Sequence, residues 1–131
     1  MGAQRRRTLD TTPSPSLQRI LEEVRARGGF QVSVLTSTDG LTITTVPSDY
    51  NSDLASAMVA LLQKVSNDVQ GQLGMAEVDE VAIRTRDNTR LVCRRIPVEG
   101  AELILAAIVP PGRTYRRVMN WAVQRIRRAM E

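Results

Sequence analysis

The chain has 131 residues, of which 42% are hydrophobic, and a formal net charge of +4 at pH 7. This length and composition suit one domain with its own core and exclude disorder of the whole chain. No run approaches the roughly 18 apolar residues that a membrane span needs, and no apolar segment follows the basic residues 5–7, so export is not expected. The single cysteine, Cys93, cannot form an internal disulfide and favours a reduced, cytoplasmic compartment.

The positive charge is concentrated at the two ends of the chain. Residues 1–16 carry a net charge of +2 and residues 113–131 carry +5, whereas residues 17–112 carry −3. A function in binding polyanions would therefore depend on the ends alone.

The first element of the expected domain is a helix that follows a tail. Residues 1–14 are basic and rich in Pro, Ser and Thr, which predicts a flexible tail before a domain over 15–131. A helix begins near Ser14 or Ser16 and ends at the glycines 28–29. Its apolar residues recur at the spacing of one buried face: Leu17, Ile20, Leu21 and Val24.

A β-hairpin is predicted next. Two runs rich in β-branched residues, 30–36 and 41–46, are joined by the polar segment 37–40. This segment contains Asp39-Gly40, and such a step between alternating runs is a strong hairpin signal because glycine supplies the positive φ that the turn needs.

The second helix, from Ser52 to about Leu73, has an unusually apolar surface. It carries only three charged residues, and small residues 55–57 and 60 extend the apolar surface nearly all the way around its first half. Its main stripe consists of Leu54, Met58, Leu61, Leu62, Val65 and Val69. We infer a self-association face; the alternative is a helix buried within the monomer.

Three strands and a basic helix complete the chain. The strands are predicted at 78–86, 90–97 and 101–109, with Asp87-Asn88 as a hairpin turn. The run 103–109 is continuously apolar, which indicates a central strand with helices on both sides. After residues 110–112 break the chain, one stripe of the last helix is apolar: Tyr115, Val118, Met119, Ala122, Ile126, Ala129 and Met130. The opposite side is arginine-rich: Arg113, Arg116, Arg117, Arg127 and Arg128.

This order of elements predicts an α+β fold, a three-layer α/β/α sandwich around a five-stranded antiparallel sheet. Over residues 15–131 the chain resembles the Roadblock family of the dynein light-chain type, as a stand-alone, bacterial-like member. The resemblance depends on the hairpin over 34–43, the long helix rich in small residues, and the strand segments 81–83, 91–98 and 103–105. Related profilin-like folds such as longin domains share much of this layout and remain open.

The resemblance implies a non-catalytic homodimer that binds and regulates or scaffolds a small Ras-like GTPase. In the family, the second helix and the third strand pair across the two-fold axis to make one continuous sheet. Carried over to this sequence, the dimer interface contains Leu54, Ala57, Met58, Leu61, Leu62, Val65, Val81 and Ile83. A symmetric dimer requires such an isologous surface.

Catalytic chemistry is not expected. The chain has no histidine, so Cys93 lacks an imidazole partner, and no catalytic residue is assigned. Glu77, Asp79 and Glu80 match no metal-binding loop, and the glycines 28–29 end a helix instead of preceding one, so neither a metal nor a nucleotide cofactor is expected. The only enzymatic role left open is GTPase activation in trans, for which no arginine is singled out.

A second hypothesis is nucleic-acid or anionic-surface binding through the arginine side of the last helix. The sparse aromatic residues argue against nucleic acid, because only Phe30 falls in a predicted strand, where single-strand binders place stacking aromatics.

Overall fold

The computed structural model describes residues 15–50 and 52–131. Its elements follow in the predicted order: α2 (Pro15–Gly28), β1 (Val32–Ser37), β2 (Thr42–Val46), α3 (Ser52–Leu73), β3 (Glu80–Arg84), β4 (Arg90–Val98), β5 (Ala101–Val109) and α4 (Arg116–Ala129). The predicted tail lies outside the described residues.

The five strands form one antiparallel sheet in the order β2-β1-β5-β4-β3. β5 is the central strand, as its continuous apolar run predicted. β3 is shorter than predicted, because the carbonyl of Val78 accepts a hydrogen bond from the Arg95 side chain and residues 86–87 already form a turn.

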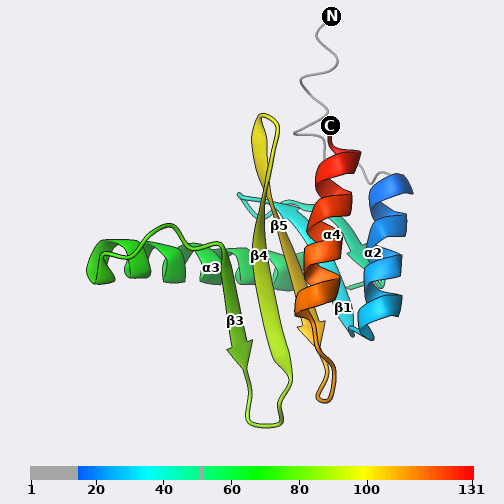
Figure 1. Cartoon of the computed structure of the whole chain (residues 1–131), viewed down its shortest axis with the longest axis horizontal. Helices are drawn as coiled ribbons and strands as arrows, with labels where there is room; N and C mark the ends of the chain where they lie inside the picture. The colour runs from blue at the N-terminus through cyan, green and yellow to red at the C-terminus, as the bar shows by residue number, and fades with distance from the viewer. Residues whose placement is uncertain (1–14, 51) are drawn as a thin grey trace, which may run out of the picture.

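Helices cover both faces of the sheet (Figure 1). α2 and α4 lie side by side on one face, whereas α3 crosses the other face and extends past the β3 edge. Alternate residues of β5 point to opposite faces of the sheet. Leu103, Leu105 and Ala107 pack with α2 and α4, and Ile104 and Ala106 face the α3 side. The predicted three-layer sandwich is therefore confirmed.

Both predicted hairpin turns are present. Gly40 has φ 89°, and Asn88 has φ 71° between β3 and β4. These values lie in the left-handed region that glycine and asparagine tolerate best. The first turn also contacts α3, because the Ser56 hydroxyl donates to the Gly40 carbonyl at 3.0 Å.

The larger core lies between the sheet and the α2–α4 pair. The predicted face of the first helix is buried there, with Leu21 and Val24 fully covered. α4 contributes Met119, Ala122 and Ile126, also fully buried. Burial of apolar area on this scale is the main stabilising contribution to the fold, and it leaves the α3 layer as a second, smaller core.

Candidate interaction site

The sheet-facing side of α3 forms the smaller core. Met58, Val59 and Leu62 pack against Cys93, Ile104 and Ala106 of the sheet, and Leu62 is fully buried. Ala55 joins Val32 and Val34 in a neighbouring cluster. These apolar residues recur at three- and four-residue spacing, which places them on one side of the helix.

Polar contacts attach α3 to the sheet along one flank. Ser56 donates to the Gly40 carbonyl, and the Gln63 amide donates to the Thr38 carbonyl at 3.5 Å. Arg95 of β4 donates to the Gln63 side-chain oxygen at 2.8 Å and to the Ser66 hydroxyl at 3.1 Å. The helix is therefore fixed from the side on which Ser56 and Gln63 lie, two turns apart.

Arg95 is the centre of this attachment. Its Nε donates to the Val78 carbonyl at 3.0 Å, and its guanidinium forms an ion pair with Glu102 at 2.8 Å. One side chain thus joins α3, β5 and the segment before β3. Arg95 was not predicted as a functional residue from the sequence, where its one signal is a pair of adjacent arginines, Arg94 and Arg95, between apolar residues of the strand.

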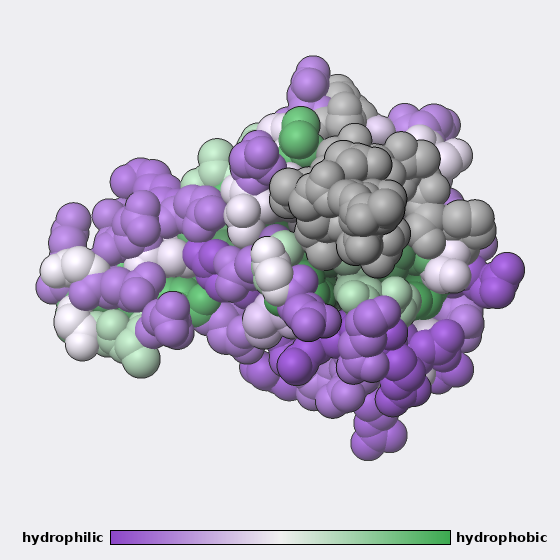
Figure 2. Space-filling model, turned by 90° about the horizontal axis from the view of Figure 1, so that it is seen from above, coloured by the Kyte–Doolittle hydropathy of each residue, from purple (hydrophilic) through white to green (hydrophobic). Residues whose placement is uncertain are grey.

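The opposite flank of α3 is apolar and exposed. Leu61 is 36% exposed and Ala57 is also exposed on this flank, while Val65 is partly buried. Ala60 is exposed too, but it lies nearer to Gln63 around the helix axis. Leu61 lies about half a helical turn away from Gln63 around the helix axis. Figure 2, which views the molecule from above, shows the projecting end of α3 as a mostly hydrophilic surface with a few hydrophobic residues. Exposed apolar surface next to a packed helix face is typical of an interaction site.

The β3 strand forms the free edge of the sheet beside α3. Val81 and Ile83 are on the α3 side of this strand, paired with Cys93 and Leu91, and Ile83 is 37% exposed. Within the described residues, β3 pairs only with β4. An unpaired edge offers backbone donors and acceptors to another strand.

The hydrogen-bond register shows which backbone groups of β3 are free. The amide of Thr85 donates to the Thr89 carbonyl, and the amide of Arg95 donates to the Asp79 carbonyl, both at 2.9 Å. Residues 79, 81, 83 and 85 therefore direct their backbone groups toward β4. By the antiparallel alternation, Glu80, Ala82 and Arg84 direct theirs outward, away from the sheet.

The predicted interface residues thus fall into separate environments. Met58 and Leu62 are buried against the sheet of their own chain, so they are not on the exposed surface, and the reason is that the sheet covers this side of the helix. Ala57, Leu61 and Ile83 are exposed, and Val65 and Val81 are partly covered. Leu54 is part of α3, but its side chain lies outside the described residues.

The arginines of the last helix are spread over α4 and its approach. Four of them are exposed: Arg116, Arg117, Arg127 and Arg128. The side chain of Arg113 lies close to Gly29, where an added β-carbon would be only 2.5 Å from the Arg113 Nε. Trp121, which is off the main apolar stripe, is partly buried between Arg27 and Arg125, whose guanidinium carbons lie 4.2 and 5.4 Å from the ring centroid.

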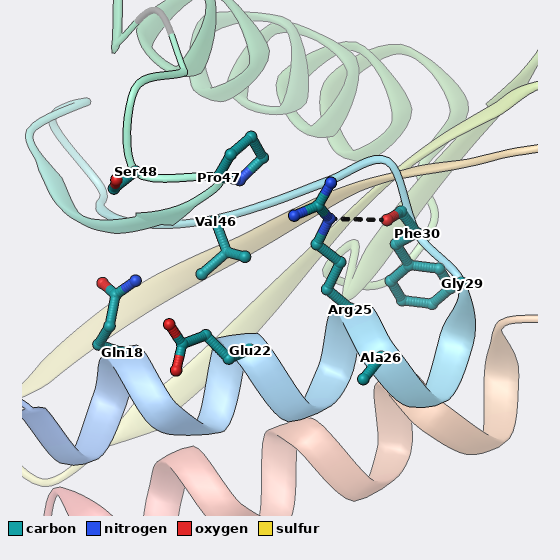
Figure 3. Close-up of a pocket in the computed structure, with 9 residues that line it drawn as sticks. All are labelled: Gln18, Glu22, Arg25, Ala26, Gly29, Phe30, Val46, Pro47 and Ser48. Atoms are coloured by element: carbon teal, nitrogen blue, oxygen red, sulfur yellow. Dashed lines mark hydrogen bonds between the residues drawn. The ribbon is translucent and has the colours of Figure 1, made fainter.

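A groove on the other side of the molecule has no catalytic character. It has a volume of about 610 Å³ and lies between α2 and the end of β2. Figure 3 shows Gln18, Glu22 and Arg25 of α2 facing Val46 and the chain after it, with Arg25 donating to the Phe30 carbonyl at 3.3 Å. Its lining residues include no nucleophile paired with a base.

The thiol of Cys93 is protected by burial beneath α3. Burial raises the pKa of this thiol from 9.0 to about 11, so it is protonated at neutral pH and is a poor nucleophile. Within residues 15–50 and 52–131, no group of three acidic, cysteine or histidine side chains could hold a metal ion. In the same ranges, no helix is both long and apolar enough to cross a membrane.

Neither a protein-family model nor a curated protein matches this chain. Solved structures do match. MglB of Myxococcus xanthus gives a TM-score of 0.73 at 12% identity, over 87% of this chain and 86% of that chain. The Roadblock/LC7 domain from Streptomyces avermitilis gives 0.63 at 19% identity, over 86% and 95%. The chain has a Roadblock-type fold.

Another structure with this fold is described as MglB with tetrameric arrangement. It gives a TM-score of 0.71 at 13% identity and covers 91% of this chain and 93% of that chain. The likeness therefore spans most of the chain, and it confirms the Roadblock-type architecture predicted from the order of helices and strands.

Proposed function

We propose that this protein is a non-catalytic homodimeric module that binds and regulates, or scaffolds, a small Ras-like GTPase in the cytoplasm. The observation that carries the proposal is the apolar flank of α3 beside the unpaired edge of β3. Leu61 and Ile83 are both more than one-third exposed there.

A second copy of the chain is the occupant that fits this surface. The outward backbone groups of Glu80, Ala82 and Arg84 suit an antiparallel partner strand, and a two-fold axis beside Ala82 would pair β3 with its own copy. On the same side, Ala57 is small enough for a partner helix to come close to α3. The dimer would then hold one continuous sheet with the two α3 helices packed beside its centre.

The GTPase is proposed as the partner of this dimer. Support comes from the Roadblock-type fold, from the family resemblance in the sequence, and from the MglB structure that is described with a tetrameric arrangement. A dimer presents a wide platform. A GTPase bound there would be regulated because the dimer positions the GTPase's own catalytic residues. No catalytic side chain of this chain is needed for that role.

A capture experiment tests the partner. The tagged protein is incubated with lysate of its own source cells in the presence of either GDP or a non-hydrolysable GTP analogue. We expect a Ras-like GTPase to be recovered preferentially in one nucleotide state. Recovery of no GTPase in either state would contradict the proposal.

A second measurement separates regulation from scaffolding. The captured GTPase is purified, and its GTP hydrolysis is measured with and without a stoichiometric amount of this protein. An accelerated or slowed rate indicates regulation, whereas binding with an unchanged rate indicates a scaffold. The Leu61→Glu variant is the control, because it should lose the effect if the dimer forms the platform.

A further inference from the structure

The second notable surface lies on the opposite side of the sheet, where the start of α2 meets the end of α4 (Figure 1). A depression of about 210 Å³ opens between the two helices. It is lined by Ser16, Arg19, Ile20, Arg125, Arg128 and Ala129. Three arginines from two helices therefore line one small hollow, and none of its described lining residues is acidic.

These three arginines have no carboxylate partner among the described residues, where ion pairs are formed by Arg27, Arg94 and Arg95. Arg94 pairs with Asp79 and Glu80, and Arg95 pairs with Glu102. Arginine stays charged at any physiological pH, so Arg19, Arg125 and Arg128 repel one another. A multivalent anion in the depression would relieve this repulsion.

Two features prepare the depression for such an anion. The ring of Trp121 stacks near the Arg125 guanidinium at 5.4 Å, which restrains that side chain before a ligand arrives. Ser16 and Arg19 belong to the beginning of α2, whose first turn contains no acidic residue. The positive end of the helix dipole therefore adds to the potential of the three arginines.

We propose that this depression binds the phosphate group of a small phosphorylated molecule. A doubly charged phosphate with several acceptor oxygens suits a hollow lined by three arginines better than a singly charged carboxylate does. The small, localised hollow favours a compact phosphate ligand over a long polyanion, which would need a track of charges. The site is on the α2–α4 layer and does not depend on the proposed dimer surface of α3 and β3.

Trp121 provides a direct reporter of binding, because it is the only tryptophan of the chain. The full chain is titrated with inorganic pyrophosphate and, separately, with orthophosphate at constant ionic strength, and the Trp121 fluorescence is followed. We expect a saturable change with pyrophosphate. The absence of a saturable change with both anions would overturn the proposal.

Single-charge variants test whether the anion occupies the depression. Arg19→Gln and Arg128→Gln remove exposed arginines of the site, and each should weaken pyrophosphate binding about tenfold, the typical loss for a charge-assisted hydrogen bond. Arg117→Gln removes an equal charge from α4, about 16 Å from Arg128 along the helix axis. This control should change the affinity by less than about twofold. Equal losses in all three variants would show diffuse attraction to a basic surface and overturn the site.

Duplex DNA and phosphatidic acid vesicles are titrated under the same conditions. Vesicle binding that depends on Arg19 and Arg128 but not on Arg117 would support the site, with a lipid headgroup as the source of the phosphate. Tight binding to DNA that all three variants weaken equally would instead support an extended polyanion surface and contradict the proposal. Unfolding temperatures equal to wild type establish that each variant is folded.

Discussion

At the residue scale, two side chains beneath and beside α3 have testable consequences. Cys93 is 2% exposed and lies in the core under the helix, and Arg95 is the polar anchor of the same helix. Cys93 belongs to an apolar cluster, whereas Arg95 makes several hydrogen bonds. Both report on whether α3 stays on the sheet.

The buried thiol predicts a loss of stability at high pH. The pKa of Cys93 is raised to about 11 in the folded protein, compared with 9.0 without burial. The neutral thiol therefore favours the folded state fully below pH 9, and this contribution is lost as the pH rises from 9 to 11. The expected loss is about 2–3 kcal/mol.

Urea unfolding of wild type and Cys93→Ala at several pH values between 8 and 11 measures this effect. The difference between the two free energies of unfolding should change over that window, because the tyrosines and other groups titrate equally in both proteins. A constant difference would contradict the burial of a protonated thiol.

Arg95 predicts a large loss of stability on truncation. Arg95→Met would leave the Val78 carbonyl, Glu102, Gln63 and Ser66 without their donor, and unpaired groups that are partly buried are costly. We expect the free energy of unfolding to fall by about 2 kcal/mol, measured in urea at one protein concentration. Arg117→Met, on the exposed side of α4, is the matched control and should change it by less than about 0.5 kcal/mol.

At the scale of the elements, α3 and β3 form one surface by two different means. α3 contributes apolar side chains that its own sheet leaves uncovered. β3 contributes backbone groups that its own ladder leaves unpaired. Each contribution can be removed without disturbing the other.

The α3 contribution is tested by Leu61→Glu. A charge on this flank is tolerated in the monomer, where Leu61 is 36% exposed, but it would be desolvated in a dimer. We expect the variant to be monomeric in light scattering. The control is Leu41→Glu, which changes a residue that is 53% exposed beside the β1–β2 turn, at the opposite edge of the sheet, and should remain dimeric.

The β3 contribution is tested by Ala82→Pro. Proline removes the outward amide at the centre of the strand and leaves the hydrogen bonds to β4 intact, which is the position where an edge strand tolerates it. We expect a folded monomer by circular dichroism and light scattering. Ala82→Val keeps the amide and should remain dimeric; dimers in both variants would exclude pairing through β3.

At the scale of the whole molecule, the proposed dimer would link stability to protein concentration. A dimer that dissociates on unfolding is stabilised by mass action. The unfolding temperature of wild type should rise by about 3 °C for each tenfold increase in protein concentration, measured by calorimetry. That of Leu61→Glu should not change, and a concentration-independent wild type would refute the dimer.

Much of the fold follows from local sequence patterns. The Asp39-Gly40 turn, the buried face of α2 and the central position of β5 were all predicted, because turn chemistry and apolar periodicity act over a few residues. The side of α3 that faces the sheet was not predicted. Its apolar residues surround nearly the whole first half of the helix, so periodicity did not separate the sheet-facing side from the exposed one, and the family resemblance placed Met58 and Leu62 in the interface along with Leu61.

The sequence by itself determined the order of the elements, the layers and the absence of histidine chemistry. Only the tertiary structure places Met58 and Leu62 in the core and leaves Leu61 and Ile83 exposed, makes Arg95 the anchor of α3, and brings Arg19 to the same depression as Arg125 and Arg128. The physical reason is the range of the interactions. Turns and helix faces depend on neighbours in the sequence, whereas these contacts join residues about 30 to more than 100 positions apart, and no local pattern encodes them.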